Sequence, residues 1–145
     1  MISYRVVRGR YADLSGEGAR LYGGRCNPPG IAAVYSSENI ALAVLEVLVH
    51  VDKAEMPSDY VVMAIRFAGR RVRRGRRAEL SGLGQLTAGR FRESHFHQPV
   101  LRVPSVIVPR EYNYVLLPDA QGFEAEVAWI EPLDFDRRLF SFLAG

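Results

Sequence analysis

The chain has 145 residues, of which 48% are hydrophobic and 24% charged, and its net charge is +3. These values predict one globular domain, residues 1–145, with a packed core. The sequence also excludes several classes of protein. No apolar run reaches the roughly 18–20 residues that span a membrane, and the first residues lack the apolar segment of a secretory signal. A single cysteine excludes an internal disulfide and a cysteine-based zinc site, so we expect a soluble cytoplasmic protein.

The first half of the chain predicts two strands, a long loop and one helix. In chain order we expect a strand at residues 2–8, a glycine-rich loop with one short helical turn at 11–30, a buried strand at 31–37 and a helix at 38–50. A loop of this length inside a compact domain is usually functional or mobile.

The predicted helix at 38–50 has an apolar stripe and one misplaced charge. Ser36 or Ser37 is expected to cap it, and Leu42, Leu45 and Val49 recur at helical spacing. Glu46 lies four residues after Leu42, along this stripe, where burying a carboxylate is costly unless it is paired. Glu46 is therefore either a carboxylate held at a cleft or a side chain at the stripe's margin that reaches water.

The second half of the chain predicts mostly strands. We expect a strand of about eight residues ending at 67, partial helix over 78–97, and strands at 100–109, 111–118, 123–132 and 133–140. Pro104 should force its strand to an edge or a bulge. Strands outnumber helices, and few strand–helix–strand units occur along the chain. The sequence therefore predicts an α+β fold with a mixed or antiparallel sheet and few helices.

Three residues are spaced so that they can meet at one cleft. Arg25 lies on the loop "GGRCNPPG", Tyr35 ends the next strand, and Glu46 lies on the helix that follows. Taken singly, Tyr35 is as readily a core aromatic and Arg25 a solvated side chain. Their order and spacing favour convergence.

The segments "LSGEGARLYGGRCNPPG", "AVYSSENIALAVLEVLVH", "LRVPSVIVP" and "NYVLLP" resemble the RES-domain toxin family. The resemblance runs from about residue 4 to residue 139. It implies a fold similar to the ADP-ribosyltransferase toxins and an enzyme that consumes NAD as its substrate. The implied reaction breaks the nicotinamide–ribose bond by phosphorolysis or hydrolysis, depleting cellular NAD and arresting growth. The alternative is transfer of ADP-ribose to a protein.

The resemblance also implies which residues act. The matching positions are Arg5, Arg25, Tyr35, Glu46, Ser105 and Asn113. Cys26 stands where the family usually has tryptophan, which removes a large aromatic group from the expected pocket wall. Pro118-Asp119 likewise replaces a frequent Asn-Pro.

These matches assign a role to each group. Glu46 would stabilise the positive charge that develops on the ribose, as carboxylates do in glycoside hydrolysis. Tyr35 would pack against nicotinamide, and Arg25 with Arg5 would bind the pyrophosphate. Ser105 would hold the nicotinamide amide or position the acceptor. The glycines around Arg25 would let the backbone approach the nucleotide closely.

The same resemblance implies partners. We expect a helix-turn-helix antitoxin of the Xre type that covers the NAD cleft, and a toxin homodimer. Nucleic acid would be contacted only through the antitoxin, and no metal is implied.

Two other functions are open from the residues themselves. Residues 70–77 hold six arginines, which suits phosphate contacts of a nucleic-acid-binding domain, or a solvated edge. His95 and His97 would share one face of a strand and could bind a metal, although no third ligand is evident. His50 is expected to be structural, at a helix C-terminus.

Overall fold

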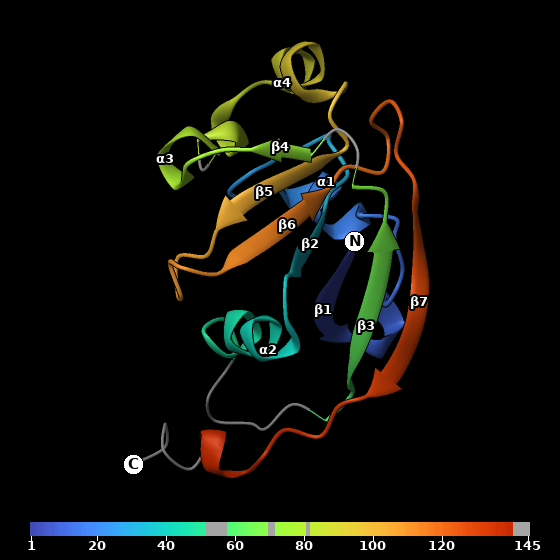
Figure 1. Cartoon of the computed structure of the whole chain (residues 1–145), viewed down its shortest axis with the longest axis vertical. Coiled ribbons are helices and arrows are strands. Elements are labelled where there is room, and N and C mark those ends of the chain that lie inside the picture. The colour runs from blue at the N-terminus through green and yellow to red at the C-terminus, as the bar shows by residue number, and fades with distance from the viewer. Residues whose placement is uncertain (52–57, 70–71, 81, 141–145) are drawn as a thin grey trace.

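The computed structural model describes residues 1–51, 58–69, 72–80 and 82–140. In this part of the chain, seven strands form one sheet (Figure 1). The strands are β1 (Ile2–Arg8), β2 (Val34–Ser37), β3 (Tyr60–Phe67), β4 (Val72–Arg74), β5 (Val100–Pro104), β6 (Tyr112–Leu116) and β7 (Ala125–Pro132). The helices are α1 (Glu17–Tyr22), α2 (Ile40–Leu48), α3 (Arg77–Leu80) and α4 (Ala88–His95), with short 3-10 turns η1 (Gly9–Tyr11) and η2 (Leu83–Gln85).

The sheet is mixed, which confirms the expected α+β class. Its order is β4-β5-β6-β2-β1-β3-β7, and β4 with β5 is the parallel pair among antiparallel neighbours. The central strands β2 and β1 come from the N-terminal half, whereas their outer neighbours β6 and β3 come later in the chain. The sheet therefore brings residues near 5, 35 and 113 next to one another.

Helices cover different parts of this sheet. Figure 1 shows α3 and α4 on the side of β4 and β5 away from α2, which lies beside β1 and β2. Phe91 of α4 packs with Leu101 and Val115 in one core cluster, and Ala43 of α2 packs with Val6 in another. Because each helix buries apolar side chains against a different strand pair, α2 is held apart from the α3–α4 layer.

Helix α2 departs from the prediction at its start and along its stripe. Its N-cap is Asn39, whose side chain accepts a hydrogen bond from the Leu42 N–H, rather than Ser36 or Ser37. Leu42 is buried as expected, but Leu45 and Val49 are exposed. The predicted stripe was therefore wrong, because the buried side of α2 is formed by Leu42, Ala43 and Leu48.

Several other predictions needed correction. The strand predicted at 31–37 begins only at Val34, and the strand predicted at 100–109 ends at Pro104. β5 is an inner strand, and Pro104 is tolerated because β4 pairs with it only up to Arg102. Residues 133–140 form no strand: the chain is irregular to residue 137 and helical at 138–140, and it buries Phe135 and Phe140 in the same core cluster as Ala43 and Leu48 of α2. The short strand β4 inside the arginine run was not predicted.

The loop at 23–30 is held by η2. The N–H of Gly84 donates to the carbonyl oxygen of Arg25 at 3.1 Å. A Cβ atom added to Gly84 would lie only 2.0 Å from the carbonyl oxygen of Gly24. The two backbones are thus in direct contact, and no side chain larger than hydrogen fits between them.

We expect Gly84→Ala to destabilise the fold by about 1–3 kcal/mol, because the methyl group forces these backbones apart. Gly82→Ala is the matched control, since a Cβ there meets nothing within 4 Å. Urea unfolding of both variants measures the difference. Equal stability of the two variants would contradict this account of the loop.

Candidate active site

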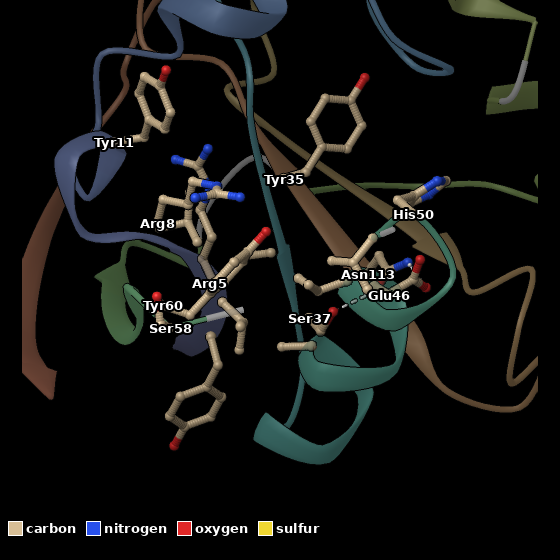
Figure 2. Close-up of a pocket in the computed structure, with 17 residues that line it drawn as sticks. Arg5, Arg8, Tyr11, Tyr35, Ser37, Glu46, His50, Ser58, Tyr60 and Asn113 are labelled. Carbon is tan, nitrogen blue, oxygen red and sulfur yellow. Dashed lines mark hydrogen bonds between the residues drawn. The ribbon is translucent and has the colours of Figure 1, made fainter. Parts of the chain in front are cut away.

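A cavity of about 770 Å³ opens between β1, β2 and α2. Figure 2 shows its polar side chains, with Arg5 and Arg8 from β1, Ser37 from β2, Glu46 from α2 and Asn113 from β6. Four elements that are distant in sequence therefore meet here, because β1, β2 and β6 are neighbours in the sheet.

Glu46 is bound through one of its two carboxylate oxygens. The Ser105 hydroxyl and the Asn113 Nδ2 group both donate to Oε1, at 2.8 and 2.7 Å. The Ser105 oxygen accepts from the backbone N–H groups of Ile107 and Val108, each at 3.1 Å. With its lone pairs engaged in this way, the hydroxyl hydrogen is directed to Glu46. Among the described residues, every hydrogen bond to this carboxylate ends on Oε1, so Oε2 is left available to a ligand.

Ser37 extends this network and was missed as a site residue. Its hydroxyl donates to Asn113 Oδ1 at 2.7 Å, and the two residues face each other across β2 and β6. Once Oδ1 accepts from Ser37, the amide of Asn113 presents Nδ2 to Glu46. The sequence pattern predicted only that Ser36 or Ser37 caps α2. The period of two along a strand, which places Ser37 on the face of Tyr35, was the signal that could have found it.

Arg5 is a cation that forms no salt bridge within the described part of the chain, although the carboxylate of Asp13 lies near enough to interact with it. Its Nη1 donates only to the backbone oxygen of Asp13, at a long 3.4 Å. Burial lowers the pKa of Arg5, and the nearby Asp13 opposes this shift. Arg8, by contrast, pairs with Asp59 at 2.9 Å. A half-buried, poorly paired guanidinium that lines a cavity is suited to an anionic ligand.

A second cavity of about 670 Å³ adjoins the first, beside α1. Both cavities are lined by Arg5, Val7, Tyr11 and Tyr35. They are two parts of one cleft, and Arg5 lies where they meet.

Tyr35 lines both parts, but its hydroxyl is occupied. The hydroxyl accepts from the backbone N–H of Cys26 at 3.1 Å and donates to Asn27 Oδ1 at 2.5 Å. Burial raises the pKa of Tyr35 well above its usual value. Asn27 is itself fixed, because its Nδ2 donates to the carbonyl oxygens of Ala19, Pro28 and Ile31. Tyr35 is therefore placed to offer its ring to a ligand rather than to transfer a proton.

Arg25 does not share the cleft. Its side chain is exposed, and it lines neither cavity. The structure gives one of the neighbouring glycines a role of its own. A Cβ atom on Gly24 would lie 2.5 Å from the Tyr35 hydroxyl oxygen, so this glycine makes room for a side chain of the protein itself.

Cys26 and Ser105 lie behind the cleft. Cys26 belongs to the core cluster with Ile31, Phe91 and Leu101 and lines neither cavity, so it does not replace a pocket wall. Burial raises the pKa of its thiol to about 11. Ser105 is fully buried and reaches the cleft only through Glu46.

The residues of the rival functions are scattered. His95 ends α4, where it is buried against Phe91, and His97 lies in the following turn rather than on a strand. Among the described residues no group of three His, Cys, Asp or Glu side chains could hold a metal. His50 follows α2 and lines the first cavity.

The arginine run is only partly described. Arg73 and Arg74 lie on β4, at one edge of the sheet, whereas Arg70 and Arg71 lie outside the described residues.

None of the helices that the structure describes is long and apolar enough to cross a membrane.

Comparison with known proteins gives consistent matches. A family model for the RES domain matches residues 2–138. "Toxin Res" of Photorhabdus laumondii is 36% identical, with 96% of this chain and 97% of the relative aligned. A "Prs ADP-ribosylating toxin" of Sphingobium sp. is 35% identical, over 78% of this chain and 79% of the relative. The fold matches a chain of the Mycobacterium tuberculosis MbcT–MbcA toxin–antitoxin complex with a TM-score of 0.69, at 18% identity, covering 98% of this chain and 87% of that one.

The buried Cys26 thiol makes stability depend on pH in the alkaline range. Its folded pKa of about 11 lies above the unfolded value near 9, so the unfolded chain loses the proton first. The free energy of unfolding should therefore fall between pH 9 and pH 11, by up to about 1.4 kcal/mol per pH unit. When the free energy of unfolding is measured with denaturant at several pH values in this range, it should fall less steeply with pH for Cys26→Ala than for the wild-type chain. Identical slopes would show that the thiol titrates alike in both states.

Proposed function

The chain belongs to the RES domain family, and from this premise we propose that it is a toxin that cleaves the nicotinamide–ribose bond of NAD. One observation carries the proposal. Among the described residues, a carboxylate with one available oxygen (Glu46) and a guanidinium that forms no salt bridge (Arg5) line the same cleft.

The two parts of the cleft suit a dinucleotide. Arg5 lies where the cavities of about 770 and 670 Å³ adjoin, as a pyrophosphate between two nucleosides requires. A guanidinium binds phosphate oxygens through paired, charge-assisted hydrogen bonds. In this arrangement Arg5 takes the pyrophosphate role that the sequence had shared between Arg5 and Arg25. Arg25 stays a candidate for contacts outside the cleft.

The polar part of the cleft would hold the ribose that reacts. As nicotinamide departs with the electrons of the glycosidic bond, positive charge develops on this ribose. Glu46 Oε2 would face that positive charge. A carboxylate stabilises such a charge most strongly in a site that excludes water. Ser105 and Asn113 would act through Glu46, by fixing Oε1, rather than by touching NAD. The ring of Tyr35 would pack on nicotinamide and orient the leaving group.

The acceptor of ADP-ribose decides the product. Phosphate, water and a protein side chain all attack the same ribose carbon after nicotinamide leaves. Transfer to a protein is the second candidate, favoured by the name of the Sphingobium relative. Labelled NAD with the purified chain, with and without phosphate and with cell lysate, would separate the three products. An unchanged NAD pool in every arm would refute the proposal.

The chain would act with a protein inhibitor. The matched fold comes from a toxin–antitoxin complex, which supports an antitoxin as partner. We propose that this antitoxin has an Xre-type helix-turn-helix domain and covers the cleft, and that the toxin forms a homodimer. The cytoplasm, where NAD is plentiful, is the proposed site of action.

Glu46→Gln should lower the rate of NAD turnover about 100- to 1000-fold, because a neutral amide cannot stabilise the cationic transition state. The fold should persist, since the amide oxygen can accept the same two hydrogen bonds. Glu111→Gln is the matched control, because Glu111 accepts a hydrogen bond from Asn39 outside the cavity lining. Nicotinamide release measures both. Full activity of Glu46→Gln would remove the central assignment.

Ser37→Ala should lower kcat about tenfold and leave KM unchanged, because it loosens Asn113 and Glu46 without removing a contact to NAD. Ser37→Thr, which keeps the hydroxyl, should retain activity. Ser36→Ala is the control, since Ser36 is also buried and also lines the first cavity but donates to Ser3 and the Tyr114 carbonyl oxygen instead. If Ser36→Ala loses as much kcat as Ser37→Ala, the network has no special role.

A further inference from the structure

The second cavity, beside α1, differs from the first in the charges that line it. Among the described residues, its charged side chains are Arg5, Asp13 and Glu17. Arg5 lies at the junction with the first cavity, so the rest of this lining carries carboxylates and no described cation. Arg20 does not line the cavity, and its guanidinium is bound to both carboxylate oxygens of Glu17. The cavity therefore favours a ligand group that donates hydrogen bonds over one that carries negative charge.

Asp13 has one carboxylate oxygen available to such a ligand. Ser15 donates to Oδ1 twice, from its backbone N–H at 3.0 Å and from its hydroxyl at 2.7 Å. Among the described residues no hydrogen bond ends on Oδ2. The bond from the Ser15 hydroxyl holds the pKa of Asp13 below its usual value, so the carboxylate is charged at neutral pH. Its backbone oxygen accepts from Arg5 at 3.4 Å, which keeps this carboxylate beside the guanidinium.

Exposed aromatic side chains line the same cavity. Tyr22 is 84% exposed and Tyr11 54% exposed. Tyr22 ends α1 and belongs to none of the core clusters of the described residues. Large side chains that gather on the surface in this way usually mark a binding site, and an aromatic ring is the surface on which a nucleotide base stacks.

We propose that the second cavity holds the adenosine half of NAD, and that Asp13 makes the chain select NAD over NADP. The inference rests on the proposed function, in which the reacting ribose lies at Glu46 in the first cavity and the pyrophosphate binds Arg5. The other nucleoside then enters the second cavity, with adenine on the ring of Tyr22 and the ribose hydroxyls at Asp13 Oδ2.

The chemistry of the two dinucleotides gives Asp13 this role. NADP differs from NAD only by a phosphate on the 2′ hydroxyl of the adenosine ribose. A carboxylate beside that ribose accepts hydrogen bonds from the hydroxyls of NAD, whereas sites that take NADP place an arginine there. The same carboxylate repels the phosphate of NADP, and the described lining of this cavity offers that phosphate no cation of its own.

The first test compares kcat/KM for nicotinamide release from NAD and from NADP by the purified chain. The wild-type chain should prefer NAD about 30-fold or more, because NADP loses a hydrogen bond and gains a repulsion. Asp13→Asn should reduce this preference about fivefold or more, mainly by lowering KM for NADP, since the amide keeps the bonds from Ser15 and loses the charge.

Asp136→Asn is the matched control. Asp136 accepts from the backbone N–H two residues ahead, as Asp13 does, but lines neither cavity. It removes the same charge from the chain and should leave the preference unchanged. Equal rates of the wild-type chain on both dinucleotides, or an Asp13→Asn variant with the wild-type preference, would overturn the inference and leave NAD cleavage intact. Cleavage of neither dinucleotide would instead refute the proposed function.

Binding without turnover gives an independent measurement. In calorimetry ADP-ribose should bind the wild-type chain about 30-fold more tightly than its 2′-phosphorylated form, and Asp13→Asn should narrow that difference. Equal dissociation constants for the two compounds on the wild-type chain would also overturn the inference, whether or not NAD is cleaved.

Tyr22→Ala tests the place of adenine. It should raise KM for NAD about fivefold or more, because the stack between base and ring is lost. Tyr22→Phe, which keeps the ring, should retain the wild-type KM. Thermal unfolding checks that the variants fold as the wild-type chain does. An unchanged KM in a folded Tyr22→Ala variant would show that adenine does not stack on this ring.

Discussion

The two hydrogen bonds to Glu46 Oε1 are the interaction on which the site depends. They bring together a helix, the end of β5 and the start of β6, and through Ser37 they also engage β2. A carboxylate on an apolar helix is costly to bury, and paired donors offset that cost. Because both donors bind the same oxygen, the structure stabilises the charge and still leaves the other oxygen for chemistry.

The opposite charge of the cleft is held differently. Arg5 lies on the strand next to β2, and its guanidinium donates one hydrogen bond within the described residues, to the backbone oxygen of Asp13. Because this buried guanidinium forms no salt bridge with the described residues, it keeps unmet hydrogen-bonding capacity. Glu46 and Arg5 form no salt bridge with each other. A substrate with an anionic pyrophosphate can therefore bind Arg5 while Glu46 stabilises the positive charge that develops on its ribose in the transition state. The ring of Tyr35 lines the cleft with its hydroxyl tied to the 23–30 loop.

Local patterns in the sequence predicted most strands and the unusual placement of Glu46, because alternation and burial cost are properties of neighbouring residues. They did not predict which side of α2 faces the sheet, since an all-apolar helix has no polar side to orient it. The prediction that Arg25 shares the cleft with Tyr35 and Glu46 was wrong. The position of its loop is set by contacts of the glycines with Tyr35 and η2, which are distant in sequence. Ser37 was missed because its partner Asn113 lies 76 residues away. Strand pairing over such distances leaves no local pattern.

The most direct test of the account is a crystal structure of the chain with a non-cleavable NAD analogue. The account predicts the nicotinamide ribose within hydrogen-bonding distance of Glu46 Oε2, the pyrophosphate on Arg5, and the bonds from Ser105 and Asn113 to Oε1 unchanged. An analogue bound away from Glu46, or a Glu46 side chain released from Ser105 and Asn113 on binding, would contradict it.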